Sequence, residues 1–179
     1  MEFNKENALC FTGHRPYPKL NGYNPNDNLE MLLALKELII DYIENKNIDT
    51  FISGMALGID MWSARIVLKL KETYPHIKLV SAIPCKNHTD AWKKNPSVIE
   101  EWEGIVNRAD IVHYVSEEPY TNWCMQVRNE WMVNNSSNVI AVWDGGLNGG
   151  TTNCVNYALK KDVKITQLHP KTLEVNKIK

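Results

Sequence analysis

Short apolar runs rich in β-branched residues recur along the chain, with longer segments of mixed character between them. The runs cover residues 8–12, 49–53, 77–83, 110–115, 138–143 and 163–168. Their length is typical of strands, and their continuous apolar character is typical of strands buried on both faces of a sheet. The pattern therefore predicts about six buried strands.

The segments between these runs carry apolar residues at the three- and four-residue spacing of an amphipathic helix. Five helical faces are predicted, formed by Leu32, Leu35, Ile39 and Ile43; by Met61, Ala64 and Leu68; by Val98, Trp102, Ile105 and Ala109; by Trp123, Val127 and Trp131; and by Val155, Ala158 and Leu159. Before the first helix, Asp27 is followed three residues later by Glu30, which predicts a capping box. We expect the second helix to begin near Ala56.

Strands and helices alternate along the chain. Because parallel strands are joined by right-handed crossovers, this order predicts a mostly parallel sheet with helices on both faces. The expected fold class is α/β, a single Rossmann-like domain over residues 1–170 followed by a polar C-terminal tail at 171–179. The length of 179 residues suits one domain, since domains usually have ~100–200 residues.

Composition and charge exclude several classes of protein. With 44% hydrophobic and 23% charged residues the chain resembles an ordinary globular domain, and no apolar run approaches the ~20 residues that span a bilayer. The first residues, MEFNKENALCFTG, lack the basic region and apolar stretch of a signal peptide, so we expect a cytoplasmic protein with no membrane attachment. Lys and Arg number 20 against 21 Asp and Glu, which disfavours general nucleic-acid binding.

The four cysteines, Cys10, Cys85, Cys124 and Cys154, are far apart and form no C-x-x-C pair. This spacing suits neither a zinc cluster nor a disulfide scaffold, so we expect buried, reduced thiols. No metal-ligating constellation or Ser-His-Asp arrangement is recognisable, and we expect no metal site and no required cofactor.

Residues with special chemistry follow the predicted strands at their carboxyl ends. They form the segments 12–16, 53–60 and 144–152, with Pro84 after the third run. Ligands of open parallel sheets bind beyond these ends, where the strand order reverses. We therefore expect a ligand site at this edge of the sheet.

Two of these segments contain glycine loops that precede predicted helices. Gly54 and Gly58 belong to the first loop, and Gly149, Gly150 and Thr151 to the second. The free N–H groups and positive dipole end of a helix start bind anions, so two such loops on one edge predict a phosphate-bearing ligand. The alternative is that the glycines only turn the chain, since neither loop is a Walker A or G-x-G-x-x-G sequence.

Two arginines lie near these loops. Arg15 follows the first strand, where its guanidinium can reach a phosphate; the alternative is a solvated surface side chain. Arg128 borders an apolar stripe of the fourth helix, which makes it a ligand contact or a partner of Glu130 or Asp110.

Acid–base groups are sparse at this edge. Asp60 and Asp144 are the carboxylates nearest to it, and each can accept a hydrogen bond from a ribose hydroxyl or transfer a proton, although Asp60 can also cap a helix. Together with Glu130 they are the candidate catalytic residues. His14 can transfer a proton or bind phosphate, or it is a plain hydrogen-bonded histidine.

Aromatic side chains follow the third and fourth strands. Trp92 and Tyr120 can stack on a base, with core packing or an oligomer surface as the alternative. The full set of expected ligand contacts is Thr12, Gly13, His14, Arg15, Ser53, Gly54, Met55, Ala56, Gly58, Asp60, Pro84, Trp92, Tyr120, Arg128, Asp144, Gly149, Gly150 and Thr151.

These motifs resemble those of a known superfamily. Residues 53–60 resemble the S-G-x-A-x-G-I-D loop of DNA-processing protein A, and Arg128-x-x-x-Met132 with the Gly149-Gly150-Thr151 loop resembles the LOG phosphoribohydrolases, both members of the SLOG superfamily. The match to its YpsA-like family runs from about Leu9 to Leu159. That closer resemblance is carried by the 12–16 segment, Ile83-Pro84, Trp92, Ala109-Asp110, Tyr120, Arg128-Asn129 and Met132-Val133.

The resemblance implies a Rossmann-like sheet with a pocket for nucleotide-derived ligands such as NAD or ADP-ribose derivatives, often within a homo-oligomer. In the LOG enzymes a glutamate of the second glycine loop assists cleavage of an N-glycosidic bond. Cys154 stands at that position here, three residues after Thr151. A thiol does not readily replace a carboxylate, so the LOG activity does not transfer simply.

The leading hypothesis is binding of a nucleotide or nucleotide-derived ligand in a sensing or sequestering role. The alternative is a hydrolase that cleaves an N-glycosidic or phosphate bond of such a ligand. A further alternative is single-stranded DNA binding, as in DNA-processing protein A, which would need a basic groove.

Overall fold

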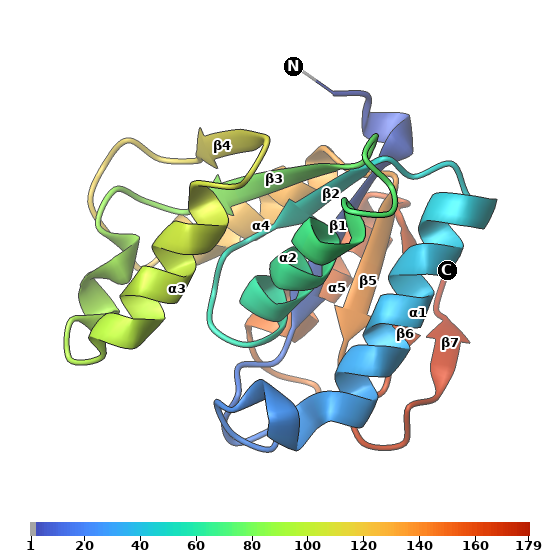
Figure 1. Cartoon of the computed structure of the whole chain (residues 1–179), viewed down its shortest axis with the longest axis horizontal. Coiled ribbons are helices and arrows are strands. Elements are labelled where there is room, and N and C mark those ends of the chain that lie inside the picture. Colours follow the sequence, from blue (N-terminus) through green and yellow to red (C-terminus); the bar gives the residue numbers. More distant parts are fainter. Residues whose placement is uncertain (1–2) are drawn as a thin grey trace.

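Seven strands form one sheet in the computed structural model, which describes residues 3–179 (Figure 1). The strands are β1 (Ala8–Gly13), β2 (Thr50–Ser53), β3 (Lys78–Ile83), β4 (Ile111–Tyr114), β5 (Asn138–Val142), β6 (Lys164–Leu168) and β7 (Val175–Lys177). Their order is β4-β3-β2-β1-β5-β6-β7, and all neighbours are parallel except the antiparallel pair β6 and β7. The expected mostly parallel α/β sheet is confirmed. Residues 1 and 2 of the expected domain lie outside the described residues.

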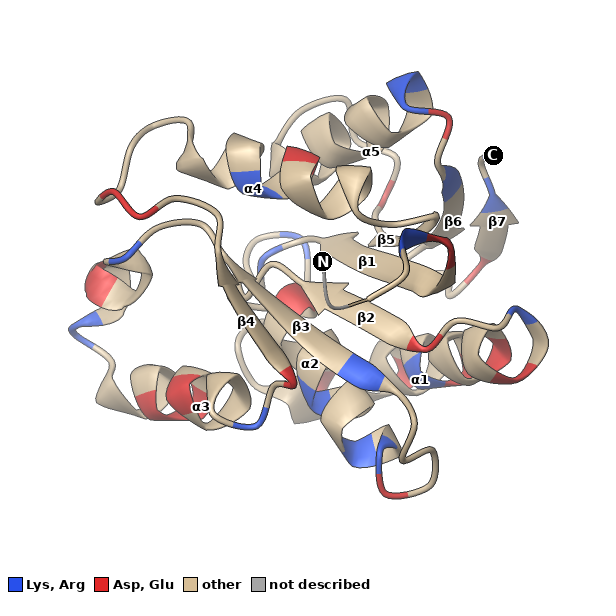
Figure 2. Ribbon diagram, turned by 90° about the horizontal axis from the view of Figure 1, so that it is seen from above, with Lys and Arg blue, Asp and Glu red and all other residues tan. Residues whose placement is uncertain are grey.

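Helices cover both faces of the sheet, as predicted (Figure 2). The helices α1 (Leu29–Asn45), α2 (Ile59–Leu70) and α3 (Pro96–Val106) pack on one face, and α4 (Cys124–Asn134) and α5 (Gly150–Lys160) pack on the other. Short 3₁₀ turns occur at Lys5–Asn7, Pro25–Asn28 and His88–Trp92. Within the described residues, none of the helices combines the length and the apolar character needed to cross a bilayer.

The central strands have hydrophobic cores on both sides. Phe11 of β1 and Phe51 of β2 stack at 6.0 Å between ring centroids in the core under α1–α3, while Cys10 and Ile52 belong to the core under α4 and α5. Burial on both faces explains why these strands read as continuous apolar runs.

The strand order places a crevice at one point of the sheet. The chain leaves β1 towards β2 on one side, and β5 lies on the other side of β1. The connections after β1 and β5 therefore diverge at their carboxyl ends, where doubly wound sheets bind ligands.

Two predictions about helix starts are wrong. Asp27 lies inside the 3₁₀ turn Pro25–Asn28, and α1 begins at Leu29 without a side-chain cap. Asn24 caps that turn instead by accepting a hydrogen bond from Asn26 N at 3.0 Å, because Pro25 starts a tight turn before the helix can form. The second helix begins at Ile59, not near Ala56, so residues 54–58 are a loop.

The predicted inner face of the fourth helix is also wrong. Trp123 and Val127 are 73% and 48% exposed, and the buried face of α4 includes Cys124, Arg128 and Met132. Both stripes have four-residue spacing, and α4 turns the second one inward because Arg128 has a buried partner below it.

The polar tail is not separate from the sheet. Residues 175–177 form β7, with Val175 opposite Leu168 and Lys177 opposite Thr166. The tail thus supplies an edge strand that the sequence pattern did not predict.

The two faces of α1 allow a matched test of the core. Leu35 is fully buried, whereas Leu33 on the same helix is 50% exposed. Leu35→Ala should lower the free energy of unfolding by about 2–5 kcal/mol, because it leaves a cavity. Leu33→Ala should lower it by less than about 1 kcal/mol in the same urea titration. Equal losses would mean that α1 packs through another face.

Candidate functional site

A cavity of about 230 Å³, the loop cavity, lies at the carboxyl end of β1. The segment after β1, the loop before α2, the helix α4 and the loop before α5 all contribute to its walls. The lining residues are Thr12, Gly13, His14, Arg15, Ala56, Leu57, Asp60, Met125, Arg128, Asn129, Asn148, Gly149, Gly150 and Thr151. Residues of both glycine loops therefore meet in one cavity, although Gly54 and Gly58 of the first loop do not line it.

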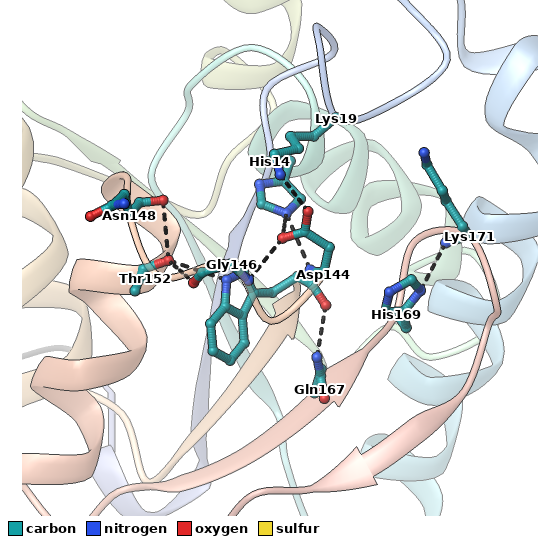
Figure 3. A network of polar contacts seen from close by, with 10 residues as sticks. His14, Lys19, Asp144, Gly146, Asn148, Thr152, Gln167, His169 and Lys171 are labelled. Carbon is teal, nitrogen blue, oxygen red and sulfur yellow. Dashed lines mark hydrogen bonds and ion pairs between the residues drawn. The ribbon is translucent and has the colours of Figure 1, made fainter.

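The start of α5 forms one wall. Gly149 is the N-cap residue and offers no side chain to the first turn, so the N–H groups there are free of side-chain acceptors. Thr152 fixes the loop by donating from its hydroxyl to Gly146 O at 2.7 Å, and Trp143 Nε1 donates to the same hydroxyl at 3.2 Å (Figure 3). Thr151 lines the cavity instead. This wall is suited to an anion.

The loop before α2 forms another wall and is held in place by several hydrogen bonds. Ser53 accepts from Met55 N at 3.2 Å and donates to Asp60 O at 2.7 Å, and His88 Nε2 contacts Met55 O at 3.0 Å. Gly58 has a φ of +91°, and a Cβ there would lie 2.8 Å from His14 O. The loop therefore requires glycine at this position.

Arg128 and Asp60 form an ion pair at the floor of the cavity. Nη1 lies 3.1 Å from Asp60 Oδ2, with both side chains more than nine-tenths buried, and it also donates to the Gly54 carbonyl. A Cβ on Gly54 would collide with this guanidinium. Burial raises the pKa of the Asp60 carboxyl, and the adjacent Arg128 opposes that rise.

This pairing excludes the two ion-pair partners that were expected for Arg128. Its partner is Asp60 and neither Glu130, which accepts from Gln126 at 2.9 Å, nor Asp110, which pairs with Lys71. The Arg128 Nε is buried without a partner among residues 3–179. The contacts of the guanidinium with protein oxygens thus involve Nη1 among the described residues.

A second polar network joins the ends of β1 and β5 (Figure 3). Asp144 lies 2.9 Å from His14 Nε2, accepts from Lys19 Nζ at 2.6 Å, and accepts from Gly146 N at 3.1 Å. The hydrogen bond from Lys19 is the main reason that the pKa of Asp144 is well below its usual range. Burial lowers the pKa of His14, although Asp144 opposes this. Asp144 therefore supports a lining residue without lining the cavity.

An aromatic groove of about 480 Å³ adjoins the loop cavity. It is lined by Arg15, Pro16, Tyr17, Tyr23, Ala56, Leu57, His88, Ala91, Trp92, Tyr120 and Met125. His88 contacts Trp92 edge-on at 4.8 Å between centroids, and burial lowers the pKa of His88 to about 4, so it is neutral at pH 7. Four residues, Arg15 among them, line both spaces, so the two are continuous.

The remaining predicted residues are placed as follows. Ser53, Gly54, Met55, Gly58 and Pro84 are buried and line neither space. Glu130 also lies outside both linings.

Four lining residues of the loop cavity were absent from the predicted set: Leu57, Met125, Asn129 and Asn148. Asn148 lies in the second glycine loop and Asn129 lies beside Arg128, so their places in the sequence could have identified them as lining residues. Nothing in the sequence marked Leu57 and Met125 as lining residues.

The cysteines are buried and free among the described residues. Burial raises the pKa of the Cys154 thiol, which the resemblance to the LOG enzymes would place at their glutamate, to about 11. Cys154 is therefore an uncharged thiol at neutral pH and supplies no carboxylate chemistry.

Comparison with known sequences gives one family. The YpsA sequence model, described as the YspA SLOG family, matches residues 9–173. A UPF0398 protein of Brevibacillus brevis is 32% identical over 129 residues, covering 72% of this chain and 67% of the relative. The SPbeta prophage-derived protein YoqJ of Bacillus subtilis is 33% identical over 154 residues, covering 78% of this chain and 90% of the relative.

Solved structures show the same fold. DNA processing protein A of Streptococcus pneumoniae has a TM-score of 0.61 at 16% identity; the match covers 93% of this chain but only 50% of that protein. DNA processing protein A of Helicobacter pylori, a structure reported for its single-stranded DNA binding mode, has a TM-score of 0.60 at 21% identity. This match covers 92% of this chain and 66% of that protein.

Replacing the arginine of the buried ion pair should lower the free energy of unfolding more than replacing an exposed arginine. Arg128→Met leaves Asp60 buried without its cation and should lower the free energy of unfolding by about 3–5 kcal/mol. Arg65→Met is the matched control, because it removes an exposed pair with Glu101 at 2.9 Å and should cost less than about 1 kcal/mol. Urea denaturation of both variants measures this, and a small loss at Arg128 would contradict the assigned pairing.

Proposed function

Because the chain belongs to the YspA SLOG family, we propose that the loop cavity and the aromatic groove together bind a phosphate-bearing, nucleotide-type ligand such as an ADP-ribose derivative. Binding of this kind is sufficient for a sensing or sequestering protein. It is also the first step of any reaction on such a ligand.

The continuity of the two spaces at Arg15 is the observation that carries this proposal. The loop cavity offers anion donors at the start of α5, and the groove offers Trp92 and Tyr120 as surfaces for a base. Arg15 lies where the two meet, and no carboxylate among residues 3–179 forms an ion pair with it. A nucleotide has the same layout, with a charged phosphate end and a flat apolar end.

In this proposal the roles of the residues differ from those expected from the sequence. Arg128 and Asp60 neutralise each other, so Arg15 and the α5 start carry the charge of the phosphates. Asp144 is already held by Lys19 and His14. The amide side chain of Asn148 is then the polar group available for ribose hydroxyls, while Asn129 lines the cavity with its Nδ2 donating to Gly150 O at 3.4 Å.

Single-stranded DNA is the less favoured ligand. Two lysines of the segment after β3 are paired with acids, Lys86 with Glu117 at 3.1 Å and Lys93 with Asp90 at 3.2 Å. Figure 2 shows basic and acidic residues interspersed along the ribbon. A DNA strand would need a run of unpaired cations along its path.

Two measurements test the proposal. Mass spectrometry of the denatured, freshly purified protein identifies any nucleotide that it retains, and calorimetry measures binding of ADP-ribose and of a single-stranded oligo-dT at low and high salt. We expect saturable binding of ADP-ribose with a weak salt dependence. Binding of oligo-dT alone, falling steeply with salt, would replace this proposal with nucleic-acid binding.

The free cation of the site gives a specific prediction. Arg15→Gln should weaken ADP-ribose binding by about 10–100-fold, because it removes a charge-assisted hydrogen bond to phosphate. Arg108→Gln is the matched control: this arginine is also exposed and forms no ion pair among the described residues, but it lines neither space. Equal affinities for the two variants would remove Arg15 from the site.

The outer stripe of α4 supports the proposal of a homo-oligomer. Trp123 and Val127 are exposed, and Trp131 stacks on His113 at 4.2 Å between centroids. The stripe is symmetric about Val127, since a tryptophan lies four residues to either side. An antiparallel α4 of a second copy can therefore pack Val127 on Val127 and bury both tryptophans.

A charge at the centre of this stripe should separate the copies. Val127→Lys should convert a dimer to a monomer in light scattering coupled to size exclusion, because two lysines would face each other at the two-fold axis. Leu33→Lys places the same charge on the exposed face of α1 and should leave the mass unchanged. A wild-type protein that is monomeric at high concentration would contradict the proposed contact.

A further inference from the structure

His14 is the one imidazole that lines the loop cavity. Its Nε2 faces Asp144 Oδ1 at 2.9 Å, and its side chain is 11% exposed. The ring therefore has one nitrogen committed to a carboxylate and one edge towards the cavity.

The surroundings of Asp144 determine which nitrogen carries the proton. Lys19 Nζ and Gly146 N–H both donate to the carboxylate, which keeps it anionic, and an anionic oxygen can only accept. The 2.9 Å contact then favours a proton on His14 Nε2. The Asp144 backbone N–H lies 3.2 Å from the same nitrogen and favours the opposite tautomer, but the charge-assisted bond to the carboxylate is the stronger one.

In this tautomer Nδ1 holds a free lone pair. Nδ1 accepts no hydrogen bond from residues 3–179, and it is not among the buried atoms that lack a partner, so it is open to solvent. A neutral imidazole of a cavity-lining residue, oriented by a carboxylate and with its second nitrogen open to solvent, is the arrangement of a general base.

We propose that His14, positioned by Asp144, is the general base for hydrolysis of a phosphoanhydride bond in the ligand bound at the loop cavity. The inference rests on the proposed function, because the bond to be cleaved must belong to the bound ligand. Arg15 and the N–H groups at the start of α5 lie where charge builds up on the phosphoryl oxygens.

The step balances with water as the co-reactant. The oxygen of a water molecule attacks phosphorus, and one water proton passes to His14 Nδ1. The P–O bond to the leaving phosphate breaks with its electron pair, and that group departs as an anion without needing a proton. The imidazolium, stabilised by Asp144, then releases its proton to solvent.

The residues that line the loop cavity favour hydrolysis of a phosphoanhydride bond over cleavage of an N-glycosidic bond. Cleavage of an N-glycosidic bond needs a carboxylate or an acid near the ribose. Asp60 is paired with Arg128, Glu130 lies outside the cavity, and Cys154 is a buried thiol. A phosphate leaving group requires none of these.

The pH dependence follows from the groups around His14. Burial lowers its pKa, Asp144 at the end of β5 raises it, and Lys19 before α1 and His169 after β6 lower it again (Figure 3). A base works only when deprotonated. The rate should therefore be constant near pH 7 and fall on acidification, below the ordinary histidine value of about 6.5.

The experiment measures binding and cleavage separately. ADP-ribose, NAD, ADP and ATP serve as probes, with affinity from calorimetry and products from chromatography, with and without added Mg²⁺. We expect a bound probe to be cleaved at its anhydride. His14→Gln should lower turnover by about 100-fold or more with affinity within about threefold, and His76→Gln, far from the cavity, should change neither.

Asp144→Asn should lower turnover and move the acidic limb of the rate profile, which a purely structural contact would not do. Thermal unfolding of each variant shows that it is folded, and added imidazole should partly restore turnover to His14→Ala. If a probe binds and none is cleaved, or if His14→Gln cleaves at the wild-type rate, the inference fails and the binding proposal stands. If no probe binds, the proposed function itself fails.

Discussion

The buried contact of Arg128 with Asp60 and the Gly54 carbonyl is the constraint on which the site depends. It joins α4, from one side of the sheet, to the loop before α2, from the other side, around the carboxyl ends of the strands. Two charges removed from water are tolerated only when they are paired in good geometry, so neither element can shift without exposing the other's charge to an apolar interior. The pair fixes the rotation of α4 and requires a residue without a side chain at Gly54.

This constraint also redistributes the chemistry of the cavity. The two residues that look most reactive in the sequence, an arginine on a helix and an aspartate after a glycine loop, neutralise each other. The other lining groups of the cavity include the exposed Arg15, the start of α5 and the imidazole of His14. A charged residue beside a glycine-rich loop can thus hold the loop in place, while its neighbours line the cavity.

The sequence predicts the sheet well and the side-chain partners poorly, for physical reasons. Strands buried on both faces have continuous apolar runs, and β1, β2, β3, β5 and β6 were found from that signal. The run at 110–115 gave β4, but the prediction that it is buried is wrong, because β4 lies at the sheet edge with Val112 and Tyr114 exposed. The rotation of α4 about its axis could not be predicted in this way, because two stripes have the same four-residue spacing, Trp123-Val127-Trp131 and Cys124-Arg128-Met132. The buried partner of Arg128 determines which stripe faces the sheet. The exposed strand β7 carries no apolar run, so periodicity could not reveal it.

The position of His14 and Asp144 follows from the strand order itself. His14 N donates to Val142 O at 3.3 Å, so the hydrogen-bond ladder between β1 and β5 continues beyond Gly13. This contact brings together the residues that follow the two strands. These two strands are neighbours although more than a hundred residues separate them in the sequence. A dyad built across this junction is held by backbone hydrogen bonds of the central sheet, and the loops that diverge on either side are left free to shape the ligand space. In the proposed reaction this junction supplies the base, whereas Cys154 in the first turns of α5 contributes only a buried thiol.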